Sequence, residues 1–273
     1  VRAEDRNATY VRSDAPDGQR DAPHVRADDP IHHAEAPDPW EGPARVDAAA
    51  TVREAARDNA AWCDAMCRAH GLPGRFTPHA WTNPRRTPPY YPDAVTLSPA
   101  ATETGVLGGI DAGPGASVKD SFAALDLAPY GFHVLFEARW LHRPAAPAPD
   151  PGGDVAWGRV RAASELREWE RACFGGEVDG LFPPSLLEEA AILYGRRDGE
   201  VVCGSVLTLT GEAVGVSNVF ATGCDDDTAW AGTVARAARL FPGRALVGYE
   251  TDTAPAERRG FTPTGPLRVW LRS

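Results

Sequence analysis

The chain has 273 residues, 43% of them hydrophobic, and its 38 acidic and 28 basic residues give a formal net charge of −10. This length allows one large or two small domains with a buried core. The negative charge argues against nucleic acids and anionic membranes as partners, because both are polyanions. We find neither an apolar run of membrane-spanning length nor a signal-peptide pattern, so a cytoplasmic location is expected.

The use of charged residues and cysteines adds two expectations. Lys119 is the only lysine, and arginine supplies the other positive charges. Together with abundant alanine, this bias indicates a bacterial genome of high GC content. The five cysteines are expected to be free thiols rather than a disulfide framework.

Residues 1–43 are predicted to be a disordered tail. They hold few large aliphatic side chains among many aspartates and prolines, so they cannot bury enough surface to offset the chain entropy. The pair His32-His33 with its acidic neighbours could bind a metal, but a solvated tail is the favoured interpretation.

A long helix is predicted at residues 46–70, with Gly71 ending it. Its apolar stripe follows the i, i+4 spacing of a buried helix face. The stripe includes Val52, Ala56, Ala60, Cys63 and Cys67.

Two of these cysteines raise the question of zinc. Cys63, Cys67 and His70 would lie on one helix face, and His79 is the nearest candidate for a fourth ligand. Structural zinc sites usually take two closely spaced pairs of ligands, which this spacing does not provide. Small buried cysteines also pack well on such a face, so we expect no metal.

Residues 81–143 mix an aromatic, proline-rich loop at 81–93 with short elements. The expected strands are 94–97, 105–110 and 132–142, with a short helix at 117–125. Residues 144–154 are rich in proline and are expected to form a stiff linker.

The elements expected next begin with a strand at 155–161. Ser164 is expected to cap a helix that runs to Phe174, and Pro183-Pro184 to start a second helix. Asp198-Gly199 predicts a tight hairpin between strands 191–197 and 200–209.

The last sixty residues form a continuous pattern. A β-branched strand at 213–222 is followed by capping residues, a helix at 229–240 and a second buried strand at 245–250. A short helix then leads to Gly260-Phe261 and a closing strand at 264–271. A strand–helix–strand unit pairs its two strands in parallel.

The order β-α-α-β-β-β-α-β-α-β, closed by GF-x-x-x-G-x-L-R-V-W, resembles the GNAT acetyltransferase superfamily over residues 155–273. The resemblance implies an α/β (α+β) fold with a GNAT-like mixed sheet and flanking helices. Tyr130-Gly131-Phe132 before an apolar strand echoes Gly260-Phe261, so we expect residues 44–143 to be a degenerate half-GNAT. Tandem GNAT proteins have such an arrangement.

The resemblance also implies an acyl-CoA, such as acetyl-CoA, as co-substrate. Pantetheine would lie between the two parallel strands, and the diphosphate would lie at the N-terminus of the following helix. Asp226 and Ala229 depart from the family's loop, which has a cation or amide and a glycine there, and Ala256 replaces its tyrosine acid. The implied coenzyme-binding residues are Val219, Phe220, Ala221, Gly223, Asp226, Thr228, Ala229, Trp230 and Ala231.

Three residues at the strand ends are candidates for catalysis. Asn218 could polarise the carbonyl, Tyr249 could protonate the leaving thiolate, and Glu250 could accept the amine's proton. The resemblance implies N-acylation of a small-molecule amine. Two alternatives stay open: a GNAT-fold protein that binds or regulates without catalysis, and an acyl-CoA enzyme of another reaction type.

Overall fold

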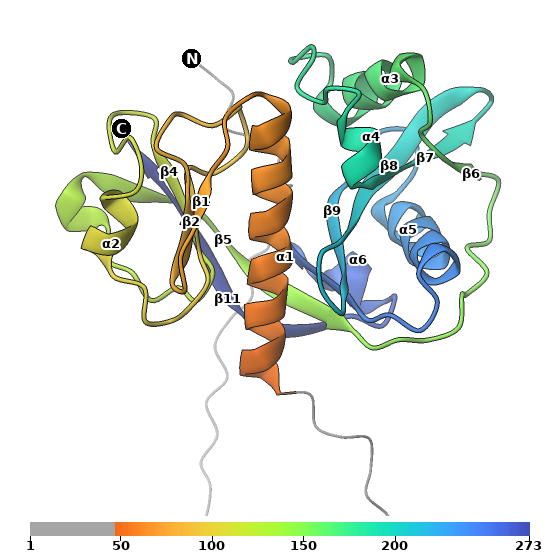
Figure 1. Cartoon of the computed structure of the whole chain (residues 1–273). Coiled ribbons are helices and arrows are strands. Elements are labelled where there is room, and N and C mark those ends of the chain that lie inside the picture. The colour runs from red at the N-terminus through yellow and green to blue at the C-terminus, as the bar shows by residue number, and fades with distance from the viewer. Residues whose placement is uncertain (1–46) are drawn as a thin grey trace, which may run out of the picture. The chain divides into compact units, whose positions relative to one another are not determined.

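The computed structural model describes residues 47–273, so the predicted tail at 1–43 and His32-His33 lie outside the described residues. From Ala48 to Ser273 the chain forms one compact unit. Its described strands make one eleven-stranded mixed sheet with helices on both faces (Figure 1). This confirms the fold class expected from the sequence.

The elements of the first part precede the proline-rich segment at 144–154. They are α1 (Ala48–Ala69), β1 (Arg75–Phe76), β2 (Ala80–Thr82), β3 (Ala94–Thr96), α2 (Glu103–Leu107), β4 (Ser117–Asp120), the 3₁₀ turn η1 (Ala128–Tyr130) and β5 (Phe132–Arg143).

The elements of the second part follow the order expected from the sequence. They are β6 (Ala156–Arg159), α3 (Ala163–Phe174), α4 (Leu186–Glu189), β7 (Ala191–Arg197), β8 (Glu200–Leu209), β9 (Val214–Ala221), α5 (Asp226–Leu240), β10 (Leu246–Glu250), α6 (Ala254–Glu257) and β11 (Thr262–Arg272).

The two parts exchange their last strands in the middle of the sheet. The strand order is β1-β2-β3-β4-β11-β5-β10-β9-β8-β7-β6. Strand β5 therefore lies between β10 and β11 and pairs antiparallel with both, while β11 reaches across to β4. The segment 144–154 is thus not a break in the sheet, because each part completes the other.

The two ends of the sheet share a parallel strand pair and a glycine before the exchanged strand. Strands β3 and β4 pair in parallel with α2 between them in sequence, as β9 and β10 do with α5. The exchanged strands β5 and β11 follow Gly131 and Gly260, which both have positive φ. This arrangement is what two related halves would produce, and the tandem origin stays a prediction.

Helices lie on both faces of the sheet. On β10, Leu246 packs with α5 and α6, whereas its neighbour Val247 packs with α1. Because successive strand residues point to opposite faces, α1 and α5 lie on opposite sides of the sheet. Figure 1 shows α1 crossing the middle of the sheet, with the first part on one side and β8 and β9 on the other.

Two short elements predicted from the sequence are wrong. Residues 105–110 were expected to be a strand, but 103–107 form α2, whose first turn is capped by the Thr102 hydroxyl. Residues 117–125 were expected to be a helix, but 117–120 form β4. The Asp120 carboxylate accepts the backbone N–H of Leu125 at 2.8 Å, which holds the following residues in a loop instead.

Local turn and cap chemistry gives a mixed result. The hairpin at Asp198-Gly199 is confirmed, with φ of 52° and 88° at these residues, as a type I′ turn requires. Ser164 is not the N-cap of α3, because the helix begins at Ala163. The Glu165 carboxylate accepts the backbone N–H groups of Arg161 and Ala162 at this end.

The exchange of β5 predicts that residues 155–273 do not fold alone. Without β5, strands β10 and β11 lose the neighbour to which both are hydrogen-bonded. We expect a 155–273 fragment to lack a cooperative urea transition and a 48–273 fragment to have one. A soluble, cooperatively unfolding 155–273 fragment would show that the second part can close its own sheet.

Candidate functional site

The site begins where the parallel strands β9 and β10 separate. They pair only at Val214 with Leu246 and at Gly215 with Val247. Beyond this point β10 continues against β5, and β9 continues against β8. The facing edges of β9 and β10 therefore diverge toward the N-terminus of α5.

A β-bulge at Asn218 bends β9 at this divergence. Two residues of β9, Asn218 and Val219, lie opposite the single residue Ser205 of β8. Asn218 has a φ of 50°, which is unusual for a residue with a side chain. Bulges bend a strand and increase its twist, so this one directs β9 away from β10.

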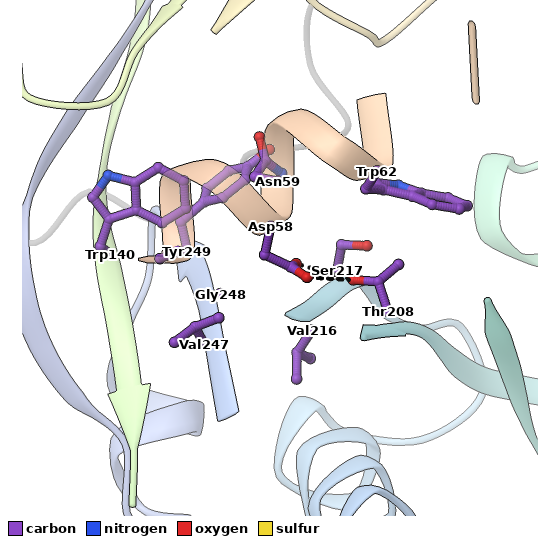
Figure 2. Close-up of a pocket in the computed structure, with 11 residues that line it drawn as sticks. Asp58, Asn59, Trp62, Trp140, Thr208, Val216, Ser217, Val247, Gly248 and Tyr249 are labelled. Carbon is purple, nitrogen blue, oxygen red and sulfur yellow. Dashed lines mark hydrogen bonds between the residues drawn. The ribbon is translucent and has the colours of Figure 1, made fainter. Parts of the chain in front are cut away.

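A small cavity lies at the closed end of the divergence, beneath α1. Its volume is about 10 Å³, close to that needed for one water molecule. Figure 2 shows α1 side chains on one side of the cavity and the ends of β9 and β10 on the other. The lining residues are Ala55, Asp58, Asn59, Trp62, Trp140, Thr208, Val216, Ser217, Val247, Gly248 and Tyr249.

Asp58 is the charged residue of the cavity wall. Its carboxylate accepts the hydroxyl groups of Thr208 and Thr210, each at 2.9 Å. A Cβ on Gly215 would lie 1.6 Å from the carboxylate oxygen Oδ2, so only glycine leaves room for the acid. Burial raises the pKa of Asp58 from 3.8 to about 6, against the lowering effect of the two threonines.

Tyr249 is joined to the first part of the chain through Lys119. The Lys119 ammonium on β4 donates to the Tyr249 hydroxyl at 3.0 Å and to the Asn59 side-chain oxygen at 2.9 Å. Lys119 is only 4% exposed and lies 4.2 Å from the centre of the Tyr249 ring. Trp140 packs edge-on against the same ring. The phenol is thus fixed by contacts from α1, β4 and β5.

Glu250 follows Tyr249 but points to the other face of the sheet, because successive strand residues alternate. Burial, and then the negative charges of Asp226 and Asp252, raise the pKa of Glu250 to about 8. Glu250 therefore lies near the start of α5 and does not line the cavity. Of the three predicted catalytic residues, the structure places only Tyr249 in the cavity wall, with Asn218 in the adjoining bulge.

The N-terminus of α5 is strongly acidic. Asp225 is the N-cap, and its carboxylate accepts the backbone N–H of Thr228 at 2.8 Å. Asp227 is paired with Arg258 at 2.7 Å. The N-cap is thus the residue before Asp226, and the Asp226 carboxylate does not cap the helix. The carboxylates occupy the place where a helix N-terminus would hold an anion.

The predicted coenzyme-binding residues lie in three environments. Gly223 and Thr228 have their backbone N–H groups bonded to Val202 and Asp225, respectively. Residues 219–221 are half-buried along the free edge of β9, and Asp226 is exposed. Side chains that are buried in the core cannot contact a ligand directly in this structure. These are Ala229, Trp230 and Ala231.

The sequence reasoning missed the contribution of α1. Asp58 and Asn59 were not chosen, although Asn59 lies seven residues after Val52 and four before Cys63 in the predicted apolar stripe. Asn59 is a polar residue at a position that the stripe predicts to be buried, and this was the sign in the sequence that could have identified it. The contacts of Asp58 with Thr208 and Thr210 join positions about 150 residues apart, which no local pattern indicates.

The cysteines considered for zinc are buried in the core. Cys63 and Cys67 pack with Met66 and Trp81, and the His70 ring lies 2.9 Å from the carbonyl oxygen of Leu181. Within residues 47–273 no group of three or more His, Cys, Asp or Glu side chains could hold a metal ion. In the same range no helix has both the length and the apolarity of a membrane span.

Comparisons with known proteins support the fold. No protein-family model and no curated protein sequence matches the chain. A solved structure described as a GCN5-related N-acetyltransferase from Kribbella flavida matches with a TM-score of 0.52 and 15% identity. The match covers 80% of this chain and 95% of that one. This likeness shows that the chain has a GNAT-like fold.

A second solved structure is described as a GCN5-related N-acetyltransferase-like protein from Streptococcus suis. It matches with a TM-score of 0.44 and 13% identity, over 82% of this chain and 99% of that one. The Kribbella flavida match, which covers 80% of this chain, extends across the first and second parts of the described chain, since either part alone is too short for such coverage.

The raised pKa of Asp58 predicts that Asp58→Asn stabilises the protein at neutral pH. The folded carboxyl ionises near pH 6 and the unfolded one near 3.8, so stability falls as pH rises between these values. At pH 7.5 the variant should be more stable by roughly 1 to 3 kcal/mol, and the gain should vanish below pH 4. Urea unfolding at both pH values measures this.

Glu200→Gln removes an exposed carboxylate and serves as the control, with little expected change at either pH. A loss of stability in Asp58→Asn at pH 7.5 would mean that the ionised carboxylate holds α1 to the sheet.

Proposed function

We propose that the chain is an acyl-CoA-dependent N-acyltransferase of the GNAT type, which transfers an acetyl or other acyl group to a small-molecule amine. The divergence of β9 and β10 around the Asn218 bulge carries this proposal. It leaves an edge on each strand without a sheet neighbour, where an extended pantetheine arm would find backbone partners. The reacting groups would meet along this divergence, and the cavity at its closed end has room for one small group.

Tyr249 is the proposed acid. Its oxygen accepts a hydrogen bond from Lys119, which leaves the phenol proton free to be donated to the thiolate. Asn218, at the bulge, is proposed to orient the acyl carbonyl. Glu250, with its pKa near 8, is proposed as the base. Because it points to the sheet face opposite the cavity, it would accept the amine's proton through a water molecule.

A second candidate is a GNAT-fold protein that binds or regulates without catalysis. The acidic start of α5 favours it, because Asp225 already occupies one backbone donor and the neighbouring carboxylates repel phosphate. We therefore expect these carboxylates to weaken binding of the coenzyme diphosphate at this end of the helix.

The direct test is acyl transfer, followed by mass spectrometry of a panel of small amines incubated with the protein and acetyl-CoA. We expect a 42-dalton increase on at least one amine, the mass of an acetyl group replacing a proton. Tyr249→Phe should lower the rate by about 10²-fold while keeping the ring in place. Coenzyme binding without any product would favour the second candidate.

The pH profile should identify the base. A carboxylate must be ionised to accept a proton, so kcat/KM of the wild type should rise as the pH passes through about 8. Glu250→Gln should remove this limb of the profile. A limb near pH 6 that is lost in Asp58→Asn would instead assign the base to the cavity carboxylate.

The acidic start of α5 also predicts how Asp226→Asn changes coenzyme binding. Asp226 is neither the N-cap nor the partner of Arg258, so the change removes one charge and leaves the helix end intact. At roughly 8 Å and an effective dielectric near 20, one pair of unit charges costs about 2 kcal/mol before screening. We expect coenzyme A to bind the variant at least about tenfold more tightly in low-salt titration calorimetry.

Asp227→Asn is the matched comparison, since it removes the same charge but also breaks the pair with Arg258. Equal affinities in the wild type and Asp226→Asn would place the diphosphate away from α5. If coenzyme A binds to neither protein, the proposal of an acyl-CoA co-substrate is wrong.

A further inference from the structure

Asp58 carries a buried charge without a counter-charge in the described structure. It is 7% exposed, and no arginine, lysine or histidine between residues 47 and 273 lies within ion-pair distance of its carboxylate. Lys119, the buried cation among the described residues, is held by Asn59 and Tyr249 instead. Buried carboxylates are normally paired with a cation, so this one lacks the partner that its environment calls for.

The chain is built to place this carboxylate at the cavity. Thr208 and Thr210 of the β8 end donate to it, and Gly215 of β9 has no side chain where the acid lies. Figure 2 shows the Asp58 carboxylate directed from α1 toward Thr208 and Ser217. The backbone N–H of Thr210 donates to it as well. A carboxylate has about four acceptor positions, so these three donors leave room for another donor.

The rest of the cavity wall suits a small cation. Trp62 and Trp140 line it, and aromatic rings attract cations, while the Tyr249 ring already has the Lys119 ammonium beside it. The cavity has about the volume of one water molecule, which is close to the size of a primary ammonium group. Three methyl groups on the nitrogen would not fit this volume.

The geometry points to the cavity as a binding site for the primary ammonium group of the acceptor, with Asp58 of α1 as its counter-ion. This inference rests on the proposed function only where it identifies the ligand as the acyl acceptor. The ammonium site itself does not depend on catalysis. The first part of the chain, through α1, then selects the substrate for a reaction centre built on β9 and β10. The accepted substrates would be primary amines, and quaternary or neutral analogues would be rejected.

Binding can be measured on the full chain without any acyl donor. The probes are n-propylammonium, the neutral analogue 1-propanol and the bulkier trimethylpropylammonium, titrated at pH 7.5 by calorimetry. We expect n-propylammonium to bind at least about tenfold more tightly than either of the others. Asp58→Asn should reduce its affinity by at least about tenfold, while Glu200→Gln, an exposed acid at the hairpin tip, should not change it.

Gly215→Ala is a second route to the same carboxylate, because the added methyl group would displace Asp58 from β9. It should also weaken n-propylammonium binding, provided that cooperative urea unfolding shows the variant to be folded. Equal affinity for 1-propanol and n-propylammonium overturns the inference, as does unchanged affinity in Asp58→Asn or no ammonium binding to the wild type.

The outcomes separate this inference from the proposed function. Ammonium binding that depends on Asp58, with no acyl transfer to any amine, supports the site and removes the transferase reading. Acyl transfer with the same KM for the amine in the wild type and Asp58→Asn supports the transferase and removes this site.

Discussion

The antiparallel pairing of β5 with both β10 and β11 is the constraint on which the rest of the structure depends. It joins the two parts of the described chain into one sheet, because β11 in turn reaches β4. Strand β5 also pairs with the edge of β10 that faces away from β9. Since β10 is held by β5 through Tyr249 and Glu250, β9 can separate from it without leaving β10 unsupported.

The same pairing explains why the first part contributes to the site. With β4 and β5 in the sheet, α1 packs across β10 and β11 and brings Asp58 and Asn59 to the point of divergence. Lys119 reaches from β4 to Tyr249 on β10, although β11 and β5 lie between these two strands in the sheet. Burying Lys119 and Asp58 costs free energy that the fold must recover elsewhere, as is common at functional sites.

The sequence predicted those features that depend on neighbouring residues. The hairpin at Asp198-Gly199, the long helix before Gly71 and the strand–helix–strand unit at the C-terminus all follow local turn, cap and periodicity rules. Short elements were less predictable. Strand β4 has four residues, and its identity depends on β3 and β11 on either side rather than on its own pattern.

The candidate site also contains residues that local sequence could predict and residues that it could not. Tyr249 and Glu250 could be chosen because they end a predicted strand, but their opposite directions required the sheet. Asp58 acts at the cavity only because α1 crosses the sheet, and its partners Thr208 and Thr210 lie far away in sequence. The apolar stripe of α1 predicted a buried face, and the polar residues beside it were the only local sign that this face does more than pack. Apolar side chains at this position would stabilise the sheet better than a buried carboxylate does, so Asp58 costs stability at the same place where the proposed ammonium site needs a negative charge.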